Sequence, residues 1–173
     1  MDPFAILGVP ARFDIDLAAV EKTHRELSRA LHPDKYVSAG ASERRDALSK
    51  AIEVNEAWRV LRDPIARAQA LLALRGVTVA EGAEGRAPAA DPEFLMEMLE
   101  QREALDTAKQ AKDLPAVHAM ARAIEARFQV ATAELTRGFA QGQAATLVAK
   151  VGELRYYKRF LDEVSAIEDE LAA

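Results

Sequence analysis

The sequence of 173 residues contains no cysteine. This absence excludes disulfide bonds, zinc sites with cysteine ligands and direct thiolate ligation of an iron–sulfur cluster. No apolar run approaches the roughly 20 residues that a transmembrane helix needs, so we expect no membrane partner. The chain begins Met1-Asp2-Pro3-Phe4, without the basic stretch and apolar core of a signal peptide, and we therefore expect a cytoplasmic location.

The sequence also lacks an excess of basic charge, with 23 Lys and Arg against 28 Asp and Glu. The net charge is -5, and it is concentrated in the second half, where residues 76–173 hold 11 Lys and Arg against 17 Asp and Glu. A nucleic-acid partner requires a basic surface, so this distribution argues against one. The three histidines, His24, His32 and His118, are not spaced as metal ligands, and no nucleophile–base or phosphate-binding motif is present. We expect no metal, no cofactor and no enzymatic activity, which disfavours a small helical oxidoreductase or hydrolase.

Helix signals dominate what the sequence does contain. Only 6% of the residues are aromatic, alanine is abundant, and no strand pattern is present, so we predict an all-α fold. An Asp-Pro pair supplies a helix N-cap followed by the first helical position. Asp2-Pro3 and Asp63-Pro64 open a short first and a short fourth helix, which end near Gly8 and Gly76. Two longer helices are predicted between them, one that begins at Asp14 or Asp16 as N-cap and runs to about Leu31, and one over about 42–62.

Apolar residues at helical spacing predict the inward faces of these four helices. His24 also falls at an inward position of the second helix, and we predict that Trp58 packs in the core rather than forming a ligand platform. The residues expected to supply the apolar surface are Phe4, Leu7, Leu17, Val20, Leu27, Leu31, Leu48, Ile52, Val54, Ala57, Trp58 and Leu61.

The remainder of the chain predicts a linker and a second domain. Residues 77–90 are rich in Gly, Ala and charge without any period, which is typical of a linker. Asp91-Pro92 opens a helix to about residue 112. Two further helices follow, over about 115–137 and 143–171, with Gly138 and Gly142 at the turn between them. We therefore predict an N-terminal domain of residues 1–76 and an antiparallel three-helix bundle of residues 91–173.

The tripeptide His32-Pro33-Asp34 stands directly after the second helix, which carries Lys22, Arg25 and Arg29 at spacings of three and four. These cations share one helix face. A basic helix face is usually solvated surface, and a tripeptide alone is a weak signal. Together, however, they place a charged turn, stiffened by proline, where a partner can reach it.

This arrangement resembles the J-domain family. The resemblance extends to Lys35, to Asn55-Glu56-Ala57-Trp58 and Leu61, and to Asp63-Pro64 with Arg67, and it covers residues 1–75. It implies an antiparallel helical hairpin that docks on the ATPase domain of an HscA/DnaK-type chaperone and stimulates ATP hydrolysis. It assigns the trigger to His32, Pro33, Asp34 and Lys35, and the docking charges to Lys22, Arg25 and Arg29. The fourth helix lacks the tyrosine that many members carry.

The J-domain pattern together with an acidic three-helix bundle resembles the HscB-type co-chaperones of iron–sulfur cluster assembly over nearly the whole chain. The likeness includes the opening Met1-Asp2-Pro3-Phe4, the Pro10-Ala11-Arg12 stretch and the segment from Phe94 to Asp106. It implies that the C-terminal bundle binds an IscU-type scaffold protein and delivers it to the chaperone. The scaffold-binding residues that it implies are Leu95, Met96, Leu99, Glu100, Glu103, Arg155 and Tyr156.

Two alternatives remain open at this point. In the first, Leu95, Met98, Leu99 and Leu105 all belong to the bundle core, and no exposed apolar patch exists. Adjacent helical positions lie ~100° apart, so the apolar residues of this segment cannot all face one core. In the second alternative, the protein is a general J-protein that delivers unfolded clients to a DnaK-type chaperone.

Overall fold

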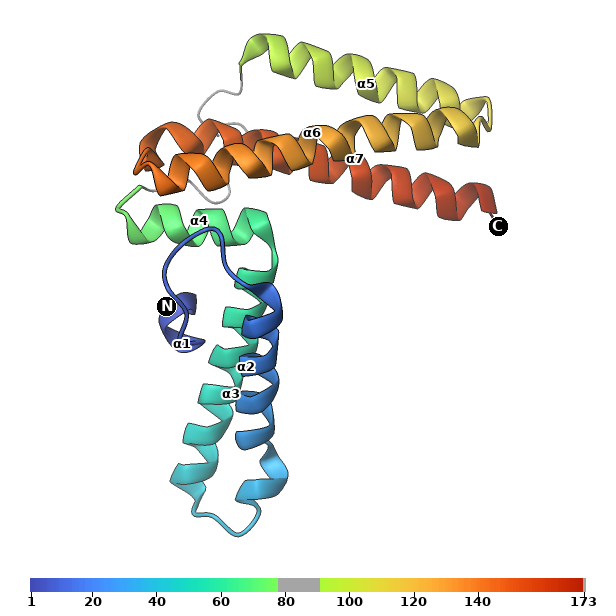
Figure 1. Ribbon diagram of the computed structural model, residues 1–173. Helices are drawn as coiled ribbons and strands as arrows, with labels where there is room; N and C mark the ends of the chain where they lie inside the picture. Colours follow the sequence, from blue (N-terminus) through green and yellow to red (C-terminus); the bar gives the residue numbers. More distant parts are fainter. Residues whose placement is uncertain (78–90, 173) are drawn as a thin grey trace. The chain divides into compact units, whose positions relative to one another are not determined.

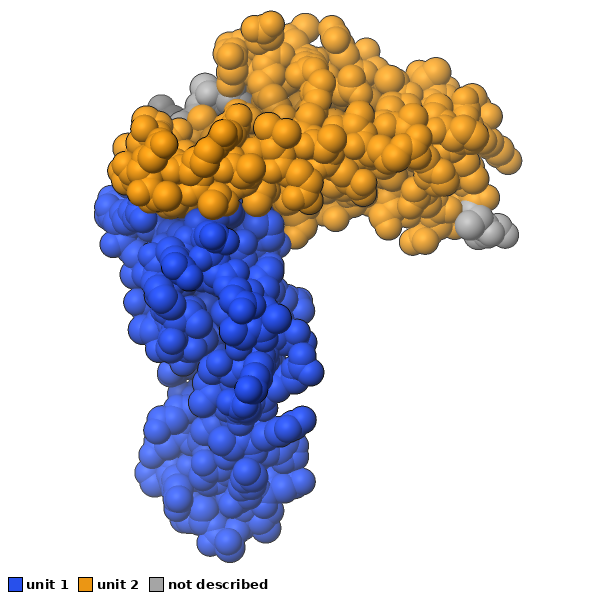
Figure 2. Space-filling view, in the orientation of Figure 1, with its two compact units in different colours: residues 1–77 blue, residues 78–173 orange. Residues whose placement is uncertain are grey.

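The computed structural model describes residues 1–77 and 91–172, and all of its regular elements in this part of the chain are helices (Figure 1). The all-α prediction is thereby confirmed. Apart from Val77, the predicted linker lies outside the described residues. The chain divides into two compact units, residues 1–77 and 78–173 (Figure 2). None of the described helices is sufficiently long and apolar to cross a membrane.

The first unit contains the helical hairpin. The short helix α1 (Pro3–Ile6) precedes α2 (Leu17–Ala30), a 3-10 turn (Pro33–Tyr36), α3 (Ala41–Arg62) and α4 (Pro64–Leu74). Helices α2 and α3 run antiparallel, and the 3-10 turn lies at their shared end (Figure 1). The predicted caps are present: the Asp2 carboxylate accepts a hydrogen bond from Phe4 N–H at 2.9 Å, and the Asp63 carboxylate accepts one from Ile65 N–H at 2.8 Å.

The core of this unit lies where α1, α3 and α4 meet the first turn of α2. Val20 is the only buried residue of α2. Arg67 is buried in the same region, where its guanidinium lies 4.8 Å from the centre of the Phe13 ring and donates a hydrogen bond to the Leu61 carbonyl oxygen. Burial lowers the pKa of Arg67. The main apolar members of the core are Phe4, Leu7, Phe13, Val20, Val54, Ala57, Leu61, Ile65, Leu71 and Leu72.

Three apolar residues predicted to face inward are exposed instead. Leu48 and Ile52 of α3 are 57% and 61% exposed, and Leu17 at the start of α2 is exposed as well. Leu48 and Ile52 are four residues apart and therefore share a helix face. The prediction was wrong because periodicity shows which residues share a face, but not whether another helix covers it.

The second unit contains α5 (Pro92–Gln110), α6 (Leu114–Ala140), a 3-10 turn (Ala144–Leu147) and α7 (Val148–Ala172), which confirms the predicted three-helix arrangement. One turn was misplaced: Gly138 lies inside α6 and is buried, so it does not bracket the turn. A Cβ atom at Gly138 would lie 2.5 Å from Leu147 Cδ2, so the missing side chain provides space for the leucine. Gly142, at a φ of 75°, forms the turn itself.

The depth of burial predicts which leucines stabilise the first unit. We expect Leu61→Ala, at a fully buried position, to lower the free energy of unfolding by about 2–5 kcal/mol. The matched variant Leu48→Ala should change it by less than about 0.5 kcal/mol, because that side chain is exposed. Urea unfolding followed by fluorescence of Trp58, the single tryptophan, reports on this unit. Equal losses in the two variants would contradict the assigned core.

Candidate partner-binding sites

The tip of the α2–α3 hairpin is formed by the tripeptide. His32 caps the 3-10 turn: its Nδ1 accepts a hydrogen bond from Asp34 N–H at 3.3 Å, and its carbonyl oxygen accepts one from Lys35 N–H at 3.0 Å. Pro33 occupies the first position of the turn. The Asp34 carboxylate lies 3.4 Å from His32 Nδ1, and its side chain is 88% exposed. The local backbone is therefore ordered, while the carboxylate stays available to a partner.

Side chains behind the tip join it to the two helices. The Tyr36 hydroxyl donates to the Ala30 carbonyl oxygen at 3.5 Å, and Arg44 donates to the Val37 carbonyl oxygen at 3.5 Å. Between them lies a depression of about 230 Å3, lined by Leu31, Pro33, Tyr36, Arg44, Ala47, Leu48 and Ala51. The tripeptide thus projects from a supported base rather than from an unsupported loop.

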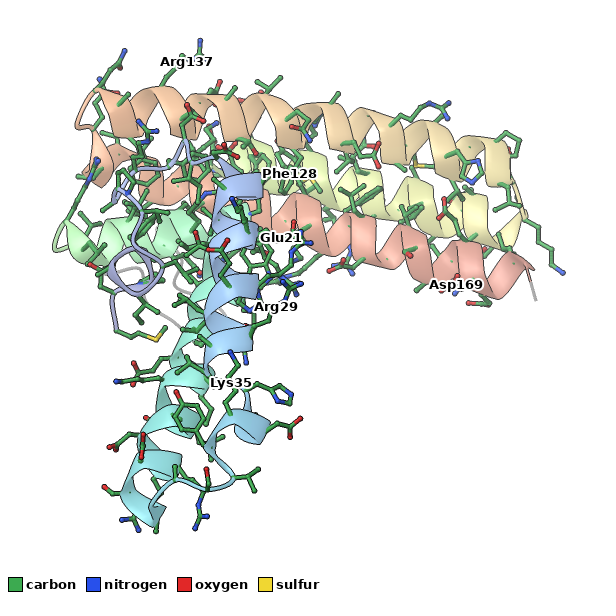
Figure 3. The ribbon with its side chains drawn as sticks, turned by 60° about the horizontal axis from the view of Figure 1, so that its bottom comes forward. Glu21, Arg29, Lys35, Phe128, Arg137 and Asp169 are labelled. Carbon is green, nitrogen blue, oxygen red and sulfur yellow. The ribbon has the colours of Figure 1, made fainter. Side chains whose placement is uncertain are left out.

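The predicted basic face is present on α2. Lys22, Arg25 and Arg29 are all exposed, and Arg25 pairs with Glu21 at 2.8 Å, one turn earlier. Figure 3 shows Glu21, Arg29 and Lys35 following one another along the hairpin toward its tip. Exposed ion pairs contribute little to stability, so this face is available for long-range attraction of an acidic partner.

A polar contact that sequence reasoning assigned only to packing fixes α2 against α3. The His24 ring stacks on the Trp58 ring with centroids 5.5 Å apart, and His24 Nε2 lies 2.9 Å from the Asn55 side-chain oxygen. Both rings are half-buried. Trp58 was predicted only as a core residue, and Asn55 was recognised only as part of a family stretch, so their joint role in positioning α2 was not predicted.

The helix α5 presents an apolar patch. Leu95, Met96 and Leu99 are 37%, 58% and 52% exposed, whereas Met98 and Leu105 are buried. The alternative in which all the leucines of this segment belong to the core is therefore wrong for Leu95 and Leu99. We call Leu95, Met96 and Leu99, together with the exposed Glu100 and Glu103, the α5 patch.

Aromatic contacts connect the first turn of α5 with α7. The Phe94 ring meets the rings of Tyr156 and Tyr157 edge-on, with centroids 5.7 and 5.6 Å apart. The guanidinium of Arg159 lies 5.7 Å from the centre of the Tyr156 ring. Phe94 directly precedes Leu95, so its ring contact places Tyr156 beside the beginning of the α5 patch. Tyr156 and Arg155 are both half-buried. Phe94 and Arg159 were not among the predicted site residues.

The described residues contain no candidate metal site. No group of three or more His, Asp or Glu side chains in the described ranges could hold a metal ion. The predictions that the protein has no cofactor and no catalytic activity stay predictions.

Comparison with known proteins identifies both units. A family model described as the DnaJ domain matches residues 2–70, and one described as the HSCB C-terminal oligomerisation domain matches residues 90–165. The co-chaperone HscB homologue of Bordetella parapertussis is 39% identical over 173 residues, covering 96% of each chain. That of Burkholderia vietnamiensis is 34% identical over 163 residues, covering 94% of this chain and 91% of the relative.

Solved structures show the same fold. The chaperone HscB from Vibrio cholerae has a TM-score of 0.88 at 29% identity, covering 99% of each chain. Human co-chaperone HscB has a TM-score of 0.87 at 22% identity, covering 96% of this chain and 81% of that one, a likeness of fold. A J domain with the tripeptide at its tip, followed by a three-helix unit, defines a J-domain co-chaperone, whose partner is a chaperone of the DnaK type. This chain belongs to the HscB family of co-chaperones.

Exposure of the α5 patch has a direct consequence for stability. We expect alanine at Leu95, Met96 and Leu99 together to lower the free energy of unfolding of the second unit by less than about 2 kcal/mol, because the three side chains are partly or largely exposed. The same change at three buried positions would remove about 2–5 kcal/mol at each. A circular dichroism melt compares this variant with Leu154→Ala, whose side chain is fully buried. A larger loss in the triple variant would place the patch in the core.

Proposed function

We propose that this protein stimulates the ATPase of an HscA/DnaK-type chaperone with its first unit and delivers an IscU-type iron–sulfur scaffold protein with its second. The chaperone contact consists of His32, Pro33, Asp34 and Lys35 at the tip and of Lys22, Arg25 and Arg29 on α2. The scaffold contact consists of the α5 patch with Arg155 and Tyr156 of α7.

The observation that carries the proposal is the exposure of Leu95, Met96 and Leu99 on a helix that buries Met98 and Leu105 in its own unit. Clustered apolar side chains with an acidic border are typical of a protein-binding surface rather than of a solvated helix face. The exposed Asp34 at the hairpin tip of the first unit supports the chaperone contact. One chain therefore offers two separate surfaces for two different partners.

The proposed mechanism is tethering. A scaffold protein held by the second unit is present at high effective concentration wherever the J domain engages the chaperone. The protein itself breaks no covalent bond in this scheme. The division at residues 77–90 into two domains and a linker, and the cytoplasmic location, form part of the same proposal.

The tripeptide is tested by Asp34→Asn in the full chain. We expect this variant to lose stimulation of single-turnover ATP hydrolysis by the partner chaperone, while its circular dichroism spectrum stays unchanged. The reason is that the exposed carboxylate makes no contact that the fold needs, since its backbone N–H holds the turn. The control is Asp46→Asn, an exposed aspartate on α3, which should behave as wild type. Stimulation by Asp34→Asn within a factor of two of wild type would remove the tripeptide from the mechanism.

Delivery is tested with the triple alanine variant of the α5 patch. It should stimulate the chaperone ATPase as wild type does when no scaffold is present, because its J domain is intact. It should lose the further stimulation that added scaffold protein produces, by about 10-fold or more at sub-saturating scaffold, because nothing then tethers the two partners. Steady-state ATPase with the scaffold titrated measures both effects.

The same experiment separates the proposal from a general J-protein. A protein that delivers unfolded clients would suppress the aggregation of a denatured test protein, and the triple variant would reduce that suppression. A scaffold-specific protein should leave aggregation unchanged with or without the α5 patch. Scaffold-dependent stimulation that survives in the triple variant would contradict the tethering mechanism.

A further inference from the structure

A second depression, of about 260 Å3, lies between α6 and α7. Helix α6 contributes small and apolar side chains to it, namely Ala126, Val130 and Ala131. Tyr157 of α7 lines the opposite side. Its remaining lining residues are Arg127, Glu134, Lys150 and Glu153, and we call this depression the α6–α7 groove.

The groove is open because α5 begins only part of the way along α6. Phe94, in the first turn of α5, contacts the ring of Tyr157, and Glu97 pairs with Arg127. Helix α6 continues from Arg127 to Ala140, while the antiparallel α5 runs in the other direction (Figure 1). Val130, one turn beyond Arg127, is consequently 58% exposed.

Ion pairs border the groove and make its rim slightly acidic. Arg127 pairs with Glu97 at one end. Lys150 lies 2.9 Å from Glu134 and 2.8 Å from Glu153 at the other. The lining itself is neutral, with two cations and two carboxylates, and Glu97, which pairs with Arg127 beside the groove, adds one negative charge to the rim. An apolar floor with an acidic rim favours an apolar side chain that has a basic neighbour.

We propose that the α6–α7 groove binds an apolar side chain of the IscU-type scaffold protein, next to a basic residue of the scaffold, and so extends the scaffold-binding surface from α5 onto α6. This inference rests on the proposed function. The two surfaces are continuous, because Tyr156 borders the α5 patch, Tyr157 lines the groove, and both rings contact Phe94. A partner seated on the first turns of α5 and on Tyr156 therefore lies beside the mouth of the groove.

The size and lining of the groove suit a contact that contributes to the binding free energy. About 260 Å3 of space corresponds to roughly nine water molecules at ~30 Å3 each. Water over an apolar floor is displaced favourably by an apolar side chain. Side chains that fill such pockets commonly account for much of the binding free energy of an interface.

The test uses four variants of the full chain and purified IscU-type scaffold protein in isothermal titration calorimetry. Val130→Arg blocks the groove and places a cation where a basic neighbour is expected, so Kd should rise about 10-fold or more. Val130→Ser removes only the apolar contact and should raise Kd about threefold. Gln129→Arg adds the same cation at the next, exposed position of α6, which does not line the groove, and should stay within about twofold of wild type. The fourth variant is the triple alanine variant of the α5 patch.

Each outcome decides one of the two ideas. Because Val130 is exposed, neither of its variants should shift the melting midpoint appreciably, and Val130→Ser carries the test if Val130→Arg is unfolded. A folded Val130 variant that binds as tightly as wild type, while the triple variant does not bind, overturns the groove and leaves the α5 patch in place. Normal binding by the triple variant overturns the α5 patch, whatever the Val130 variants do. Equal weakening by Gln129→Arg and Val130→Arg would show a general charge effect and also overturn the groove.

Discussion

Packing at one end of the α2–α3 hairpin is the constraint on which the chaperone contact depends. Between Val20 and Ala47 no residue of the described chain is buried. Apolar burial provides most of the favourable free energy of folding, so the half of the hairpin away from the tip holds the unit together. The tip contributes little to the free energy of folding, so its residues can be polar, charged and exposed. The His24–Trp58 stack and the Asn55 contact extend the order of the base toward the tip.

Local signals in the sequence predicted the helix starts well. The three Asp-Pro pairs, at Asp2, Asp63 and Asp91, each cap a helix, because the carboxylate satisfies backbone N–H groups that the first turn leaves without partners. Such caps act over three residues and need no tertiary information. The tripeptide was found for the same reason: its residues are contiguous, and proline and histidine organise the turn through neighbouring atoms.

Contacts between distant residues could not be predicted in this way. Leu48 and Ile52 have the spacing of core residues, yet both side chains are exposed. Gly138 looks like a turn residue, but it lies inside α6, where the Leu147 side chain occupies the space of its missing Cβ. The resemblance supplied the residues of the α5 patch, whereas their exposure followed only from the three-dimensional packing. The α6–α7 groove had no sequence signal. It exists because the first residues of α5 lie only part of the way along α6, so that the last turns of α6 extend beyond α5.

The two proposed contacts differ in physical character, and the difference suits a delivery protein. The chaperone contact is dominated by exposed charges on α2 and at Asp34, which accelerate association but are screened by salt and hold weakly. The scaffold contact is dominated by apolar side chains, whose burial mainly slows dissociation. A partner that leaves slowly stays bound while the other contact forms and breaks. The chain would therefore keep its scaffold through several encounters with the chaperone, and the charged contact would determine when delivery occurs.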